Sequence, residues 1–135
     1  MGIKMPRYSM RRLAVALVVL ALGLAAVGVA LGSGGTTLGL IADPGGAPTF
    51  NKKTLTAKAG KVTIVMSYHC NLTKYGCLQI PHNIAIKGHG VNVKGPVIPT
   101  GTSTVSVSLK KGTYEFYCSF GDHEAYGMKG TLIVK

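Results

Sequence analysis

Apolar and polar residues alternate through one stretch near the C-terminus, "TSTVSVSLKKGTYEFYC", and a period of two restricts that stretch to β-strands. The residues "KKGT" interrupt the alternation at 110–113, and their composition is typical of a turn. The pattern therefore predicts a hairpin with one face in a hydrophobic core. The residues predicted on that face are Val105, Val107 and Leu109 before the turn and Tyr114, Phe116 and Cys118 after it.

Further strand signals fill the rest of residues 38–135, and no segment there has the period of a long helix. The segments "KVTIVMSY", "PHNIAIKG" and "GTLIVK" read as strands, and "LGLIAD" and "NKKTLTAKAG" read as edge strands. In "PHNIAIKG", His82 shares its inward face with Ile84 and Ile86. Short strands separated by Gly, Pro and Asn turns predict an all-β fold, an antiparallel β-sandwich in one domain over 38–135.

The N-terminal region has a different character. A basic flank with Lys4 and three arginines precedes nineteen uncharged and mostly apolar residues, Leu13 to Leu31. As a helix this run would be about 28 Å long, close to the hydrocarbon thickness of a bilayer. Residues 1–32 are therefore expected to form a hydrophobic helix, which is either a cleaved signal peptide or a retained signal anchor. Residues 33–37 read as a flexible tether, and the domain that follows is expected to lie outside the cytoplasm.

The charge of the chain is strongly positive, with a formal net charge of +11. Within 38–135, eleven lysines stand against four acidic residues, which gives +7, and there is no arginine. Nucleic-acid sites usually carry arginine forks and aromatic platforms, so we expect no nucleic-acid binding. We interpret the charge as a soluble basic surface that suits an acidic partner or anionic headgroups.

Three metal-binding residue types recur at five-residue steps near the C-terminus: Cys118, His123 and Met128. The intervening segment "SFGDHEAYG" has two glycines and no apolar period, so it reads as a loop, and Pro81 stiffens the approach to His82. Singly, these residues could be ordinary core or strand residues. Together they would form a His₂Cys set with a methionine, which suits both oxidation states of copper. Zinc would more often draw further cysteines or a carboxylate.

The segment "YEFYCSFGDHEAYGMKGTLIV", with "HN" some thirty-five residues upstream, resembles the small blue copper proteins, the plastocyanin/azurin group of cupredoxins. The resemblance covers nearly all of the outer domain and implies a Greek-key cupredoxin fold that binds one type 1 copper ion. It implies that His82, Cys118 and His123 are strong copper ligands and that Met128 is a weak axial one.

The resemblance also implies that Asn83 joins the two ligand-bearing segments by hydrogen bonds to the main chain or hydroxyl of Ser119. One departure is visible, because the loop reads Gly121-Asp122 where the family commonly has Pro-Gly before the second histidine. A carboxylate beside a copper ligand should favour Cu(II) and lower the reduction potential.

Two further cysteines, Cys70 and Cys77, lie in "YHCNLTKYGCLQIPHN". In an oxidising compartment they would most simply form a disulfide, which leaves Cys118 free as a ligand. The alternative is a second metal site made from His69, Cys70 and Cys77. His89 is expected to be a solvated loop residue.

These observations predict an extracytoplasmic protein that transfers one electron through a bound copper ion. The family resemblance implies that His123 is the electron's route to solvent. Its partner would be a redox protein with an acidic docking surface, and the N-terminal helix would contact a membrane if it is retained. We expect no enzymatic activity, because four protein ligands leave no open position on the metal and the sequence has no paired His-x-His motif. The alternative function is copper storage, delivery or sensing with the same ligands.

Overall fold

The computed structural model describes residue 2 and residues 34–44, 46–70 and 80–135. Apart from residue 2, the hydrophobic helix and the signal or anchor segment expected over 1–32 lie outside the described residues. The same is true of Cys77, so its pairing with Cys70 stays a prediction. Within the described ranges, no helix has the length and hydropathy that a membrane crossing requires.

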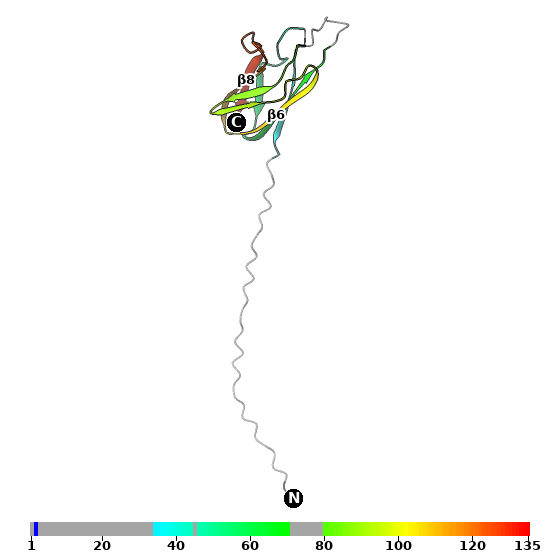
Figure 1. Ribbon diagram of the computed structural model, residues 1–135. Coiled ribbons are helices and arrows are strands. Elements are labelled where there is room, and N and C mark those ends of the chain that lie inside the picture. Colours follow the sequence, from blue (N-terminus) through cyan, green and yellow to red (C-terminus); the bar gives the residue numbers. More distant parts are fainter. Residues whose placement is uncertain (1, 3–33, 45, 71–79) are drawn as a thin grey trace. The chain divides into compact units, whose positions relative to one another are not determined.

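The described part of the chain forms eight strands in two sheets (Figure 1). One sheet has three strands in the order β1-β3-β6, and the other has five in the order β2-β8-β7-β4-β5. The predicted all-β sandwich is therefore confirmed. The strands are β1 (Thr36–Ile41), β2 (Thr54–Ala57), β3 (Gly60–Tyr68), β4 (Ala85–Gly88), β5 (Val91–Lys94), β6 (Gly101–Leu109), β7 (Gly112–Tyr117) and β8 (Lys129–Val134).

The core lies between the inner faces of the two sheets, where the sequence pattern places it. Val62, Ile64 and Met66 alternate along β3 and are fully buried. Phe116 on β7 and Leu132 on β8 are equally buried in the opposite sheet. Burial of such side chains contributes roughly 1.5–3 kcal/mol each, so this shared core is the main stabilising element of the domain.

The predicted hairpin at 110–113 is wrong. β6 pairs with β3, whereas β7 pairs with β4 and β8, so the chain crosses from one sheet to the other after Leu109. The hydroxyl of Tyr114 donates a hydrogen bond to the carbonyl oxygen of Lys110 across this crossing, at 3.0 Å. The alternation does mark two inward faces. In a sandwich, however, such faces belong to either sheet, and the period does not specify the partner strand.

The two expected edge strands are confirmed, but their pairing direction differs from the antiparallel expectation. β1 runs parallel to β3, and β2 runs parallel to β8, so both sheets are mixed. Because β1 and β3 run in the same direction, Ile41 lies beside Ser67. The residues that follow β1, including Asp43, therefore reach the end of the sandwich where Tyr68 lies. The predicted ligands are at the same end.

Candidate metal centre

Two neighbouring strands bring the predicted ligands together. β4 pairs with β7, with Ala85 opposite Tyr117, so the residues just before β4 lie beside those just after β7. Cys118 directly follows β7, and His82 lies three residues before β4. Since these two strand ends adjoin, His82 and Cys118 meet although they are 36 residues apart in the chain.

His82 is not part of strand β4, contrary to the prediction for "PHNIAIKG". His82 forms an isolated bridge with Ile98. The N–H of His82 donates to the carbonyl of Ile98 at 2.9 Å, and the N–H of Ile98 donates to the carbonyl of His82 at 2.8 Å. Its main-chain groups are therefore satisfied outside the five-stranded ladder. Pro81, which has no N–H to donate, precedes it and is consistent with the break.

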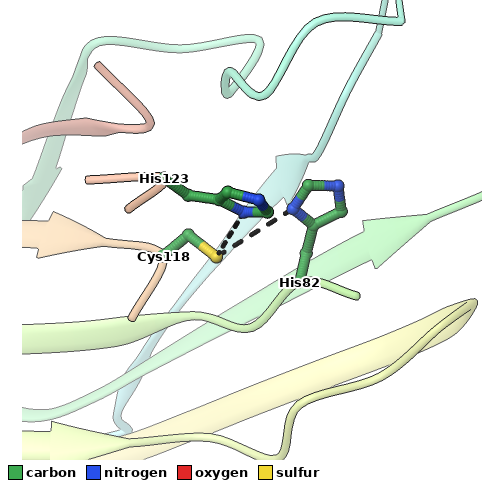
Figure 2. Close-up of side chains that lie close together, drawn as sticks. All are labelled: His82, Cys118 and His123. Carbon is green, nitrogen blue, oxygen red and sulfur yellow. Dashed lines mark hydrogen bonds between the residues drawn. The ribbon is translucent and has the colours of Figure 1, made fainter. Parts of the chain in front are cut away.

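The three predicted strong ligands converge on one point, as Figure 2 shows. The sulfur of Cys118 lies 3.5 Å from Nδ1 of His123 and 3.9 Å from Nδ1 of His82, and the three donor atoms all lie within 4.8 Å of one another. Donors about 2.1 Å from a common centre in a trigonal arrangement would be about 3.6 Å apart. The observed separations therefore suit one ion between the three donors.

The converging side chains are also buried. The exposed fractions are 0% for Cys118, 1% for His82 and 8% for His123. Within the described ranges this is the one group of His, Cys, Asp or Glu side chains with metal-binding geometry. One soft thiolate and two imidazoles form a donor set that fits copper better than a hard cation.

Met128 is fully buried, and its main chain closes the ligand loop. The N–H of Cys118 donates to the carbonyl of Met128 at 3.0 Å, and the N–H of Met128 donates to the carbonyl of His123 at 2.8 Å. The three residues at five-residue steps are thus joined directly through their main chains. This contact explains how even spacing in the loop brings its two ends together.

Asn83 and Ser119 make the hydrogen bonds that the family resemblance implies. The side-chain oxygen of Asn83 accepts the Ser119 N–H at 2.8 Å, and its amide donates to the Ser119 hydroxyl at 2.9 Å. The same amide donates to the carbonyl of Gly95 at 3.0 Å, and the N–H of Asn83 points at the sulfur of Cys118, 3.5 Å away. The ligand-bearing segments are therefore held together independently of any metal.

The site environment favours uncharged donors before metal binding. Burial, with a smaller contribution from the charge of His123, lowers the pKa of His82 to about 4. Burial also lowers the pKa of His123, although Asp43 and Asp122 oppose the shift. Burial raises the pKa of Cys118, against the hydrogen bonds from the main chains of Asn83 and Phe120. At neutral pH the imidazoles are therefore ready to bind, whereas the thiol must lose a proton on metal uptake.

Sequence reasoning did not single out Asp43 or Tyr68, which lie against the first histidine. Oδ2 of Asp43 is 3.7 Å from Nε2 of His82, and the Tyr68 ring meets the His82 ring edge-on at a centroid distance of 4.6 Å. Burial raises the pKa of Asp43, and the positive charge of His123 opposes that shift. No sequence motif contains Asp43. Its only sequence signal is its position at the end of the apolar segment "LGLIAD".

The remaining candidates lie elsewhere or cannot be placed. His89 is exposed at the turn after β4, where its ring meets that of Tyr114 at 5.1 Å, so it takes no part in the site. The alternative second metal site stays a prediction, because one of its three residues, Cys77, lies outside the described residues. Cys118 is a free cysteine, as a ligand must be.

A two-sheet sandwich with a buried His-Cys-His set at one end defines a copper protein of the blue-copper class. Residues 40–135 match the family model described as copper binding proteins, plastocyanin/azurin family, and the chain belongs to this family. The donor set fits a single type 1 copper ion as its cofactor.

Solved structures with the same fold include two auracyanins. A dithionite-reduced auracyanin from the photosynthetic bacterium Roseiflexus castenholzii matches with a TM-score of 0.58 and 22% identity, over 74% of this chain and 97% of that one. Auracyanin B matches with a TM-score of 0.58 and 20% identity, over 74% of this chain and 88% of that one. At such identities the likeness concerns the fold. No curated protein matches the chain.

Proposed function

We propose that this protein is an electron carrier that works outside the cytoplasm, with His82, Cys118 and His123 as strong copper ligands and Met128 as the axial ligand. The observation that carries the proposal is the convergence of three buried donor atoms within 4.8 Å of one another. Copper bound there would supply a one-electron Cu(I)/Cu(II) couple. The proposal includes no substrate chemistry and therefore no enzymatic activity.

A carrier of this kind needs a site that changes little between oxidation states. The hydrogen bonds of Asn83 and the closure of the loop through Met128 hold the donors in place without a metal. A preorganised donor set keeps the rearrangement on electron transfer small. We assign this positioning role to Asn83 and Ser119.

His123 is the proposed route for the electron, because it is the most exposed of the three converging donors. The docking patch would be formed by three exposed apolar side chains: Ile80, Val97 and Tyr126. Ile80 and Tyr126 each lie two residues before a predicted ligand, and Val97 precedes Ile98, the bridge partner of His82. The lysine excess of residues 38–135 would steer a redox partner with an acidic surface toward it.

The proposed location rests on the N-terminal sequence. Basic residues before an apolar run of nineteen residues favour export of everything that follows, whether the segment is cleaved or kept as an anchor. A disulfide between Cys70 and Cys77 would agree with an oxidising compartment.

Copper storage, delivery or sensing is the alternative, and it would need rapid exchange of the metal. Donors that are 0–8% exposed and cross-linked by hydrogen bonds favour slow exchange. The two functions can be separated by measuring electron self-exchange and copper release to a competing chelator in the same preparation.

The direct test is the optical spectrum of the purified, oxidised, copper-loaded protein. We expect an intense band toward the red end of the visible range that bleaches on one-electron reduction. A colourless protein with full Cu(II) occupancy would overturn the proposed site. Copper loss faster than electron exchange would overturn the carrier function in favour of copper handling.

A further inference from the structure

The carboxylate of Asp43 lies on the side of His82 that faces away from the cysteine. Figure 2 shows the two ring nitrogens of His82 on opposite sides, with Nδ1 toward the sulfur of Cys118. The other nitrogen, Nε2, is buried and has no hydrogen-bond partner among the described residues. The carboxylate oxygen Oδ2 of Asp43 lies 3.7 Å from it.

Within the part of the chain that the structure describes, both groups are unsatisfied unless they interact. Oδ1 of Asp43 is also buried there without a hydrogen-bond partner, and the Asp43 side chain is only 16% exposed. The separation of 3.7 Å exceeds a hydrogen bond by about half an ångström. A small rotation of the carboxylate would close it and remove the cost of a buried unpaired donor.

The main chain holds Asp43 at this place. Its N–H donates to the carbonyl of Thr49 at 2.8 Å, and the N–H of Ala42 donates to the carbonyl of Ser67 at 2.9 Å. Asp43 has a φ of 55°, a left-handed conformation that aspartate tolerates better than most residues. The loop after β1 is therefore fixed in a conformation that directs a carboxylate at the ligand histidine.

We propose that Asp43 is a positioning residue that accepts a hydrogen bond from Nε2–H of His82 and so fixes the tautomer whose Nδ1 lone pair faces the metal site. A neutral imidazole carries its proton on one nitrogen only. A proton held on Nε2 leaves Nδ1 free as the donor, whereas the other tautomer would point N–H at the copper position. A carboxylate in this place also makes the imidazole a stronger donor and favours Cu(II).

This inference rests on the proposed copper site for its purpose, but its central test needs no metal. Nitrogen NMR of the metal-free full-length chain, labelled at histidine, reports the tautomer of each ring. Wild-type His82 should be almost entirely the Nε2–H form. Asp43→Gly permits the same φ and removes the carboxylate, so the Nδ1–H form should become substantially populated. Asp43→Asn keeps an acceptor oxygen and should restore most of the Nε2–H form.

Asp122→Asn is the matched control, since it removes a carboxylate from the ligand loop that makes no contact with His82. It should leave the tautomer of His82 unchanged. Cu(II) affinity should fall about 10- to 100-fold in Asp43→Gly, the usual cost of losing a ligand's hydrogen-bond partner. The reduction potential should rise.

An unchanged His82 tautomer in folded Asp43→Gly would overturn the inference, and so would an equal change in Asp122→Asn. The dispersion of the amide spectrum shows whether each variant is folded. If Asp43→Gly is not folded, Asp43→Ala, which also lacks an acceptor oxygen on its side chain, provides the test. Failure of the proposed function would give a different result. The tautomer of His82 would still depend on Asp43, but the oxidised, copper-loaded protein would be colourless.

Discussion

The side chain of Asn83 exchanges hydrogen bonds in both directions with Ser119, 36 residues further along the chain. It accepts from the main-chain N–H and donates to the hydroxyl. The link joins the segment of His82 to that of Cys118, so the metal need not assemble the site.

Removal of this link should destabilise the metal-free domain. Asn83→Ala leaves the Ser119 N–H and the Gly95 carbonyl without their partner, and we expect a loss of about 2–3 kcal/mol in the free energy of unfolding. Ser119→Ala removes the hydroxyl but keeps the N–H bond, so it should cost about 1 kcal/mol. Denaturant unfolding of both metal-free variants measures these values. An equal cost for the two substitutions would contradict the role given to the main-chain bond.

Cys118→Ser should abolish the visible colour while the variant still binds metal. The intense absorption requires a thiolate on the metal, and serine offers only an oxygen at a fully buried position. Optical spectra at matched copper occupancy check this. His89→Gln, at the turn after β4, is the control and should keep the full wild-type spectrum.

Acid should destabilise the metal-free protein through its buried imidazoles. Because the pKa of His82 falls from 6.5 to about 4 on folding, the unfolded chain binds more protons between these values. This contribution is fully present above pH 6.5 and is lost as the pH falls through about 4, a change of roughly 3 kcal/mol. The raised pKa of Asp43 acts in the opposite sense over the lower part of this range.

The measurement is the free energy of unfolding of the metal-free protein at a series of pH values. His82→Gln should make the dependence clearly shallower, with a remainder that comes from the lowered pKa of His123. His89→Gln should leave the dependence intact. A slope that does not decrease on the loss of His82 would place its origin in another group.

Gly130→Ala should strongly destabilise the fold. A methyl group there would collide with the ring of the fully buried Phe116 and lie 2.6 Å from the carbonyl oxygen of Lys53. Overpacking of this kind costs about 1–3 kcal/mol, measured by thermal or denaturant unfolding. Gly39→Ala is the matched control on an edge strand, because an added methyl group there would have no neighbour within 4 Å. If Gly130→Ala proved as harmless as Gly39→Ala, the proposed steric cause would be wrong.

The sequence predicts those parts of this fold that local period and spacing encode. Alternation along β3 places Val62, Ile64 and Met66 in the core, and the even steps after Cys118 identify the ligand loop. Each of these features depends on residues that are near one another in the chain.

Features that depend on contacts between residues far apart in the chain cannot be predicted from local patterns. The alternation on either side of residues 110–113 predicts a hairpin, but the chain crosses between the sheets there, because an inward face does not specify the sheet to which it belongs. The place of Asp43 beside His82 follows from the parallel pairing of β1 with β3, a direction that no local pattern records. Such contacts become visible only when both segments are placed in space.

The course of β1 also determines how the domain can be attached to anything else. The strand begins at Thr36 and runs toward Asp43, so the first strand residue of the sandwich lies roughly 20 Å from the end that holds His82. A surface, a carrier protein or an electrode joined through that first residue would therefore leave the copper-binding pole free to meet a diffusing partner.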